Sequence, residues 1–240
     1  NIELLQMYLS IIIPTYNELS TIATIINHLQ KCLVGKQYEI IVSDGGSTDE
    51  TLAIAKKMGV KTVLSDVKGR SGQMNFGVKH ASGDVFYFVH ADSLPVVTFF
   101  EDINQAIAND YNCGSFRTKF DNAMLLLKCN AFFTRFNYLF FRGGDQSIFI
   151  TRKLWQQVGE YKESMLIMED YDFLARIWQK GKFKLIPKAT IVSARKYEEN
   201  TWLTVQLANL KIVKMYKKGA SQQEMLSKYK ELLSYRKNAF

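Results

Sequence analysis

The chain of 240 residues has only three cysteines, only three prolines and no long apolar run. Cys32, Cys113 and Cys129 are widely spaced and include no Cys-x-x-Cys pair, which argues against a disulfide framework or a zinc site and predicts reduced core residues. No stretch approaches the roughly 20 apolar residues that span a bilayer, and the N-terminus lacks the pattern of a signal peptide. We therefore expect a cytoplasmic protein.

The sequence also lacks a Gly/Ser-rich linker, an internal repeat and any signature of nucleic-acid binding. One α/β domain over residues 1–240 is therefore expected, without nucleic acid as a partner. The formal charge is +8, and residues 195–240 hold ten Lys or Arg against four Glu. This basic segment is either a solvated helical surface or a contact with anionic lipid. Residues 1–6 precede the first strand, and their deletion is expected to leave the melting temperature unchanged.

The first half of the chain alternates between apolar strands and amphipathic helices, an order that indicates a parallel sheet with right-handed crossovers. Ser20 and the stretch Ser47–Glu50 have the form of helix caps. The carboxyl ends of the strands are expected at one edge, which is where open α/β sheets bind ligands. Strands are predicted at 9–14, 38–43, 61–65 and from residue 85, helices near 22–33, 50–58 and 72–80, and edge loops at 14–18, 44–47, 66–73 and 90–95.

The second half is less regular, and mixed strand pairing is expected there. Strands are predicted at 113–120, 146–151 and within 183–193, and helices at 122–140, 153–158, 169–180, 200–218 and 221–236. The helix at 122–140 is rich in Leu and Phe but contains Lys128 and Arg135, so it is too polar to span a membrane. Its apolar side chains would pack in the core, form a dimer surface or lie in a bilayer interface, and core or dimer packing is favoured.

Two aspartates follow predicted strands of the first half. Asp44 precedes Gly45, where a carboxylate can bind a base or ribose while the bare backbone lets a ligand approach; a turn aspartate bonded to its own backbone is an equal alternative. Asp92 suits Mg²⁺ or Mn²⁺ held together with substrate phosphates. His90 either ligates the same metal or packs and forms hydrogen bonds, and the second role is favoured because imidazole suits Mg²⁺ poorly.

The loop and first turn after the third strand are suited to a phosphate group. Arg70 is the predicted contact with a diphosphate, and Gln73 and Asn75 lie close to it in the sequence. The alternative is that Arg70 is an ordinary surface arginine at a helix start, a position that the helix dipole disfavours for a cation.

Glu169 and Asp170 open a later helix that is rich in core residues. A rigidly held carboxylate there would act as a base or would complement the helix dipole. Gly144, Asp145 and Gln146 form a second glycine-opened acidic loop with the same two interpretations.

Taken together, these motifs resemble the family 2 glycosyltransferases, which have the GT-A fold. The resemblance covers almost the whole chain and rests on Ser10–Glu18, Val42–Asp49, His90–Asp92 and Glu169–Asp170. A compact bacterial subgroup, some of whose members are associated with arsenosugar biosynthesis, is also similar in Gly69–Asn75, His90–Ser93, Gly144–Gln146, Met168–Asp170 and Ser193–Arg195. The implied architecture is a mostly parallel central sheet with helices on both faces.

The resemblance implies an inverting transferase that moves a sugar from a nucleotide-sugar donor to an acceptor hydroxyl with the help of Mg²⁺ or Mn²⁺. It implies a nucleotide-binding half at about 7–110, an acceptor half at about 111–195 and basic C-terminal helices at about 196–240. Asp170 would be the general base, with Glu169 beside it, and Asp92 would bridge the metal to the diphosphate. The implied donor residues are Pro14, Tyr16, Glu18, Asp44, Gly45, Arg70, Gln73, Asn75, Ala91 and Asp92, and the implied acceptor residues are Gly144, Asp145, Gln146 and Arg195.

The sequence departs from the family's usual Asp-x-Asp metal motif, because His90 takes the place of the first acid. This leaves open a non-catalytic nucleotide-sugar-binding protein, although the acids Asp92, Glu169 and Asp170 favour an enzyme. A sugar nucleotidyltransferase is disfavoured, since no Gly-rich loop with a following basic residue comes after the first strand. The acceptor is expected to be a small molecule or a lipid-linked compound, and a homodimer and a peripheral contact with the inner membrane face stay open.

Overall fold

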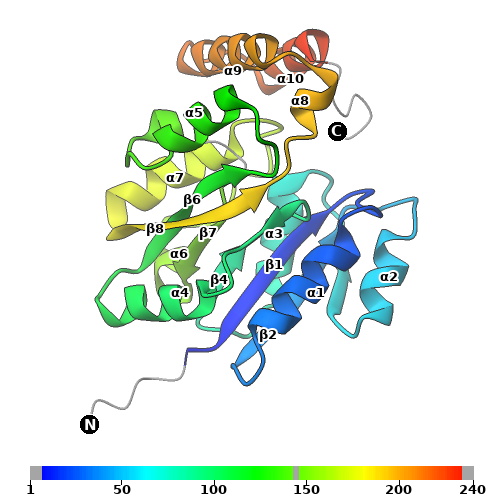
Figure 1. Ribbon diagram of the computed structural model, residues 1–240, viewed down its shortest axis with the longest axis vertical. Helices are drawn as coiled ribbons and strands as arrows, with labels where there is room; N and C mark the ends of the chain where they lie inside the picture. Colours follow the sequence, from blue (N-terminus) through cyan, green and yellow to red (C-terminus); the bar gives the residue numbers. More distant parts are fainter. Residues whose placement is uncertain (1–6, 143–145, 234–240) are drawn as a thin grey trace.

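The computed structural model describes residues 7–142 and 146–233, and their strands form one eight-stranded sheet with helices on both faces (Figure 1). The strands are β1 (Leu9–Thr15), β2 (Tyr38–Asp44), β3 (Lys61–Leu64), β4 (Val85–Phe88), β5 (Ser93–Leu94), β6 (Cys113–Phe120), β7 (Ile148–Thr151) and β8 (Phe183–Val192). The helices are α1 (Ile22–Cys32), α2 (Thr51–Lys57), α3 (Arg70–Lys79), α4 (Phe99–Ala108), α5 (Leu125–Phe133), the 3-10 turn η1 (Leu139–Phe141), α6 (Arg152–Val158), α7 (Glu169–Lys180), α8 (Lys196–Glu199), α9 (Trp202–Lys217) and α10 (Gln222–Leu232).

The order of the strands across the sheet is β3-β2-β1-β4-β7-β6-β8-β5. Strands β1 to β4 are parallel, with β1 between β2 and β4, so the predicted alternation of strand and helix in the first half is confirmed. Strand β7 is antiparallel to both β4 and β6, while β8 is parallel to β6, which confirms the mixed pairing expected for the second half. Because β4 pairs with β7, both halves of the chain share one sheet.

Side chains that alternate along the strands build two apolar cores, one on each face of the sheet. Along β1, Ile11 and Ile13 join the core covered by α1 and α4, whereas Ile12 joins the core covered by α3, α6 and α7. The aromatic strand β4 divides its side chains in the same way. Burial on both faces explains why these strands read as continuous apolar runs rather than alternating ones.

The two helix caps expected in the first half are not the ones that form. The residue at the cap position of α1 is Thr21 rather than Ser20, and at α2 it is Glu50; neither makes a side-chain capping bond. The start of α2 is instead stabilised by Asp49, whose carboxylate accepts from the Thr51 amide at 2.9 Å. A complete capping box does form at Ser221 and Glu224, where α10 begins.

The aromatic helix predicted at 122–140 is much shorter than expected. Helix α5 ends at Phe133, and of its side chains only Leu127 is buried. The expectation of core packing is therefore wrong for most of this segment, whose side chains are largely exposed. Within the described residues, no helix is both long enough and apolar enough to cross a membrane.

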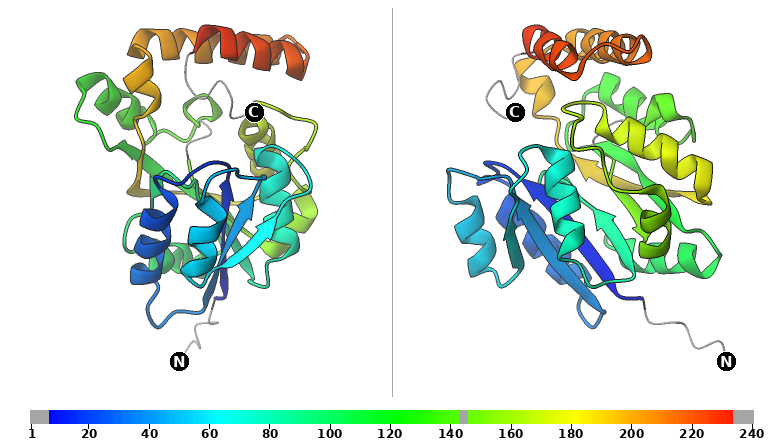
Figure 2. Two further views of the ribbon diagram at one scale, coloured as in Figure 1. Left: turned by 90° about the vertical axis from the view of Figure 1, so that its right-hand side faces the viewer. Right: turned by 180° about the vertical axis from the view of Figure 1, so that it is seen from behind.

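The C-terminal helices form a separate layer. Both views in Figure 2 show α9 and α10 lying side by side across the end of the molecule that is opposite the N-terminus. Their shared apolar contacts include Val205, Ala208 and Leu233, with Tyr197 of α8 packed against them.

Two of the three cysteines differ from the expectation of core residues. Cys113 is buried, but Cys32 is half-buried and Cys129 is exposed on α5.

Candidate functional site

The loops that follow β1 and β2 are bonded to each other at the carboxyl edge of the sheet. The Asn17 amide donates to the Ser47 hydroxyl at 2.8 Å, and the Asn17 side-chain oxygen accepts from the Thr48 amide at 2.8 Å. The Glu18 amide donates to the Thr51 hydroxyl at 2.8 Å. Asn17 has a φ of 54°, a left-handed conformation that asparagine tolerates better than most residues. These bonds hold the two loops in a fixed relation.

Asp44 is fully buried at this edge, and its carboxylate binds its own turn. One oxygen accepts from the amides of Gly46 and Ser47 at 2.9 and 2.7 Å. The other accepts from the hydroxyls of Ser47 and Thr15 at 2.6 and 3.2 Å. The turn-aspartate interpretation thus accounts for three of the four hydrogen bonds, the fourth coming from Thr15 of β1, and Asp44 orders the backbone at the end of β2.

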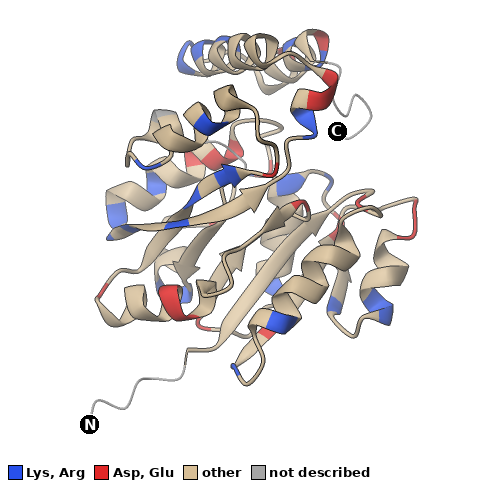
Figure 3. Ribbon diagram, viewed as in Figure 1, with Lys and Arg blue, Asp and Glu red and all other residues tan. Residues whose placement is uncertain are grey.

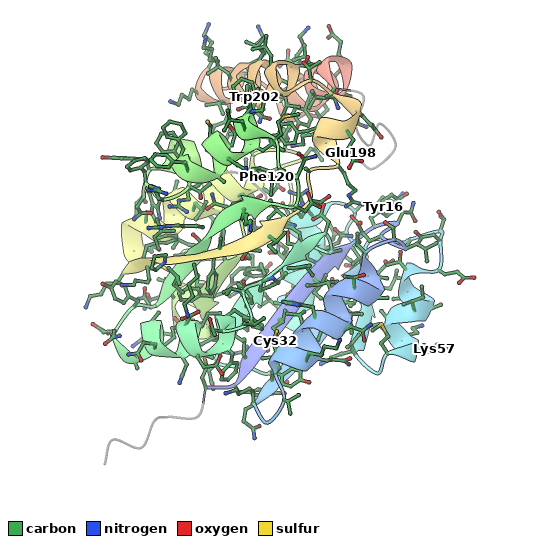
Figure 4. All side chains as sticks on the ribbon, in the orientation of Figure 1. Tyr16, Cys32, Lys57, Phe120, Glu198 and Trp202 are labelled. Atoms are coloured by element: carbon green, nitrogen blue, oxygen red, sulfur yellow. The ribbon has the colours of Figure 1, made fainter. Side chains whose placement is uncertain are left out.

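Gly45 and Gln73 lie against each other next to this turn. The side-chain nitrogen of Gln73 donates to the Thr15 carbonyl at 2.5 Å, so the start of α3 is bonded to the end of β1. A Cβ atom at Gly45 would overlap the side-chain nitrogen of Gln73, so a larger residue there would displace that side chain from the Thr15 carbonyl. Of the neighbouring residues, Pro14 is buried within β1, and Tyr16 is half-buried at the same end of the molecule as Phe120 and Glu198, far from Cys32 (Figure 4).

Asn75 is turned away from this edge and joins α3 to a distant segment. Its side-chain nitrogen donates to the Tyr161 carbonyl at 2.9 Å and to the Glu163 carboxylate at 3.1 Å. Its side-chain oxygen accepts from the Tyr161 amide at 2.9 Å. These three bonds give Asn75 a structural position beneath the site.

Arg195 joins the ends of three strands through two carboxylates. Its Nη2 donates to Oδ2 of Asp92 at 2.8 Å and to Oε2 of Glu18 at 3.2 Å. The backbone fixes this meeting, because Ser93 pairs with Val192 and the amide following β8 donates to the Asp92 carbonyl at 3.2 Å. Arg195 therefore contacts Asp92 and Glu18, two residues for which the resemblance implied a donor role, while its own implied acceptor role stays a prediction.

The segment from His90 to Ser93 is a turn rather than the continuation of β4. The Ser93 amide donates to the His90 carbonyl at 3.0 Å, and β4 ends at Phe88. The alternation of a strand therefore does not place His90 and Asp92 on one side. Ala91 between them is buried.

The atoms at this edge that could bind a metal ion are carboxylate oxygens of Asp92 and Glu18, and the guanidinium of Arg195 lies between them. No group of three or more His, Cys, Asp or Glu side chains in the described ranges is arranged to hold a metal ion. Mg²⁺ and Mn²⁺ commonly bind through one or two carboxylates and complete their shell with substrate phosphates and water. Asp92 fits that mode, and the guanidinium of Arg195 shows that Asp92 and Glu18 together accept a positive charge.

Arg70 joins the start of α3 to the pair of acids on α7. Its Nη1 is 3.3 Å from Oε1 of Glu169 and 3.7 Å from Oδ2 of Asp170, and its side chain is 37% exposed. Gly69, with a φ of 99°, is the residue immediately before α3. The two acids occupy the first turn of α7, where the helix dipole stabilises negative charge.

The residue before the acid pair has a strained backbone. Met168 has a φ of 67°, a left-handed conformation that is costly for a side chain of this size and that clusters at functional sites. Beneath the pair, the Tyr161 ring stacks on Phe173 with centroids 3.9 Å apart. Burial raises the pKa of Tyr161 well above its ordinary value, and the nearby carboxylates of Asp170 and Glu169 raise it further.

Gln146 serves a buried arginine. Its side-chain oxygen accepts from Arg142 at 2.7 Å, and its nitrogen donates to the Phe141 carbonyl at 3.0 Å. Burial, followed by the charge of Arg117, lowers the pKa of Arg142 to about 10. Gly144 and Asp145 lie outside the described residues.

Sequence reasoning missed several residues that shape this edge. Thr15 and Ser47 bind Asp44, and Tyr161 supports the acid pair from below. A hydroxyl placed next to a strand end was the available signal for Thr15 and Ser47. Nothing local distinguishes Tyr161, because its importance comes from contacts with α3 and α7.

A curled, mixed α/β sheet with acids and arginines at the carboxyl ends of its parallel strands is the arrangement of the GT-A fold. Residues 10–154 match the profile of glycosyl transferase family 2, and the chain therefore belongs to that family. Both the predicted fold and the predicted family are confirmed.

Curated relatives are similar over parts of the chain. A dolichol-phosphate mannosyltransferase of Pyrococcus furiosus is 37% identical over 91 residues, which are 36% of this chain and 26% of that protein. A PGL/p-HBAD biosynthesis glycosyltransferase of Mycobacterium tuberculosis is 29% identical over 181 residues, which are 70% of this chain and 68% of that protein. The chain thus spans about a quarter of the first relative and about two thirds of the second.

Solved structures share the fold at low sequence identity. The Staphylococcus aureus TarS fragment 1–349 in complex with UDP-GlcNAc superimposes with a TM-score of 0.65 at 20% identity, over 79% of this chain and 59% of that one. The mannosyltransferase PcManGT of Pyrobaculum calidifontis, in complex with GDP-Man and Mn²⁺, gives a TM-score of 0.68 at 15% identity, over 95% of this chain and 70% of that one.

Proposed function

We propose that the chain is an inverting glycosyltransferase that moves a sugar from a nucleotide-sugar donor to an acceptor hydroxyl. The observation that carries the proposal is the contact of Arg70 with Glu169 and Asp170. This contact puts two carboxylates beside the loop that begins α3, and membership of glycosyl transferase family 2 supports a donor at the same edge. The acceptor is a small molecule or a lipid-linked compound, and the proposed location is the cytoplasm.

The donor side is built from the loops after β1, β2 and β4. In the proposal, Glu18, Tyr16 and the backbone at Gly45 face the nucleoside, while Asp44 acts by ordering that backbone. Asp92 would hold Mg²⁺ or Mn²⁺, which when bound stabilises negative charge on the departing diphosphate. The complexes of two neighbours with UDP-GlcNAc and with GDP-Man and Mn²⁺ support this assignment.

The acceptor side is built around the first turn of α7. Inversion requires the acceptor hydroxyl to attack the anomeric carbon from the side opposite the leaving diphosphate, and a base must take the hydroxyl proton. We assign that proton to Asp170, with Glu169 holding Arg70 in place. The carbon–oxygen bond to the diphosphate breaks as the new glycosidic bond forms, and Arg70 and Arg195 provide positive charge at the leaving group.

A non-catalytic nucleotide-sugar-binding protein is the second candidate, because His90 replaces an acid at the usual metal motif. It would bind the same donors and release no nucleoside diphosphate when acceptors are supplied. A binding test alone does not separate the two candidates, whereas a turnover test does.

The first experiment is a thermal-shift screen of nucleoside diphosphates and nucleotide sugars, with and without Mn²⁺ or Mg²⁺. UDP, GDP, UDP-GlcNAc and GDP-Man are the first probes, and a selective rise in melting temperature identifies the donor class because the ligand binds only the folded state. The donor is then incubated with pools of sugar and lipid-linked acceptors, and the released diphosphate is measured. If no nucleotide shifts the melting temperature, the proposal is wrong.

A further inference from the structure

An exposed apolar surface lies on α5 and on the segment that follows it. Six large side chains take part, with exposures of 72% at Leu125 and 45% at Phe133. We call this surface the aromatic patch, and its members are Leu125, Leu126, Phe132, Phe133, Phe136 and Tyr138. Clusters of exposed apolar side chains of this kind mark interaction sites rather than ordinary surface.

The patch is an ordered surface. The rings of Phe132 and Phe136 contact each other with centroids 6.0 Å apart, and Phe133 stacks on Phe141 at 5.3 Å. Beneath it, the buried guanidinium of Arg142 donates to the Thr134 carbonyl at 3.1 Å and to the Phe136 carbonyl at 3.0 Å. A buried cation therefore fixes the backbone that carries the exposed rings.

The charges in this segment all have one sign. Between Asn122 and Phe141 the sequence contains Lys128 and Arg135 and no Asp or Glu. The Arg135 guanidinium lies 3.7 Å from the centroid of the Phe132 ring, so positive charge is in direct contact with the patch. Figure 3 shows basic residues on α5 and α9, with the acidic residues of this end of the molecule on α8 and α10.

Helix α9, which is linked to α5, repeats the same composition. The Tyr197 hydroxyl accepts from Asn130 of α5 at 3.4 Å and from Gln206 of α9 at 3.5 Å. From Trp202 to Lys217, α9 contains three lysines and no acid, and Leu203, Leu207, Leu210 and Lys214 are exposed at helical spacing. Two adjacent segments thus combine exposed apolar side chains with positive charge only.

We propose that the aromatic patch docks on a lipid surface that carries anionic headgroups. Aromatic and leucine side chains enter the boundary between headgroups and acyl chains, while Lys128 and Arg135 contact the phosphates. A second copy of the chain is a poorer occupant, because a two-fold contact would bring the same cations together with no acid in the patch to pair with them. This inference goes beyond the proposed transfer reaction and does not depend on the donor.

Cys129 provides a direct probe, since it is exposed on α5 between Leu125 and Phe133 while Cys113 is buried. With Cys32 replaced by Ala, an environment-sensitive fluorophore is attached to Cys129. Vesicles of phosphatidylcholine with phosphatidylglycerol should shift its emission to the blue, and vesicles of phosphatidylcholine alone should not. Added salt should weaken the response, because it screens the attraction between cations and headgroups.

Vesicle co-sedimentation of unlabelled variants separates the two contributions. The double variant Leu125→Ser with Phe133→Ser should bind at least about tenfold more weakly. Lys128→Gln and Arg135→Gln should each cost about fivefold at low salt and little at high salt. Leu64→Ser on β3 and Lys57→Gln on α2 are matched controls, since these residues are exposed but distant from the patch, and both should bind as the unchanged protein does.

Three results would overturn the proposal. The first is absence of binding to anionic vesicles by the unchanged protein. The second is binding that is equal on neutral vesicles or unaffected by the patch variants. The third is a doubled mass in light scattering that the double variant abolishes, which would make a second copy the occupant. A thermal melt of each variant confirms folding, and nucleotide thermal shifts report the proposed function independently.

Discussion

Replacing Arg195 by Ala should leave two carboxylates without the cation that bridges them. The Arg195 Nη2 atom is 2.8 Å from Asp92 and 3.2 Å from Glu18. The side chains are 28% exposed for Arg195, 25% for Asp92 and 6% for Glu18, so Glu18 becomes a nearly buried charge while Asp92 keeps part of its hydration. Breaking a fully buried pair costs about 3–5 kcal/mol. Partial exposure reduces this to roughly 2 kcal/mol.

For a chain of this size, ~2 kcal/mol corresponds to a melting temperature about 4–8 °C lower. A divalent cation that binds Asp92 should then recover part of the loss. We expect Mn²⁺ to raise the melting temperature more in Arg195→Ala than in the unchanged protein, because only the variant lacks the guanidinium that bridges the two acids. Differential scanning calorimetry at matched ionic strength, with Mn²⁺ and with Na⁺ as the control salt, measures both effects.

Arg176→Ala is the matched control for this experiment. Arg176 is 22% exposed and pairs with Asp172 at 2.8 Å, and Asp172 keeps Lys162 as a second partner. Its loss should lower the melting temperature without making the protein more responsive to Mn²⁺. The reasoning is refuted if Arg195→Ala is as stable as the unchanged protein, or if Mn²⁺ shifts all three proteins equally.

Three further predictions concern the acid pair, α3 and the thiols. Asp170→Asn should reduce transfer about 10²- to 10⁴-fold while the thermal shift with the donor persists, and near-normal turnover would exclude Asp170 as the base. Asn75→Ala removes three hydrogen bonds to residues 161 and 163 and should cost about 3 kcal/mol, seen in calorimetry as a fall of about 6–12 °C; an unchanged melting temperature would contradict this. Burial raises the pKa of Cys113 from 9.0 to about 12, so at pH 8 its thiolate fraction is about three orders of magnitude below that of a thiol with the ordinary pKa. The exposed Cys129 should therefore be alkylated before Cys113, which mass spectrometry measures. Equal labelling of Cys113 and Cys129 would refute this.

The strands of the first half could be predicted because their signals are local. Runs such as Leu9–Thr15 and Val85–Phe88 are rich in apolar residues and are buried along their whole length, so a short apolar stretch identifies them. The capping pattern at Ser47 misled because its hydroxyl binds Asp44, a partner in the preceding strand. A capping pattern in the sequence does not form a cap when its hydroxyl has another hydrogen-bond partner in the folded structure.

The length of α5 could not be predicted for a related reason. Apolar periodicity continues past Phe133, but the carbonyls of Thr134 and Phe136 bind the buried Arg142 instead of continuing the helix. The assumption that leucine and phenylalanine side chains are buried also fails there, since Leu127 is the only buried side chain of α5. Tertiary contacts thus determine both where α5 ends and which of its side chains are buried.

The sequence predicted which acids of the candidate site lie at strand ends and helix starts, but it did not predict which residues contact one another there. Asp92 and Glu169 follow a strand and open a helix, positions that a sequence pattern can identify. That Arg195 would bind Asp92, and Arg70 would bind Glu169, depends on contacts between residues 103 and 99 positions apart. A single sequence, taken without an alignment, contains no signal for such pairs.

The bridge between Glu18 and Arg195 closes over 177 positions of the chain, which has a consequence for biosynthesis. During translation Glu18 and Asp92 emerge long before the arginine that neutralises them. At about 5–20 residues per second, the ribosome needs at least about 5–20 seconds to add the residues between Asp92 and Arg195. The Arg195 contacts with Glu18 and Asp92 can therefore form only late in synthesis, after nearly the whole sheet has been translated.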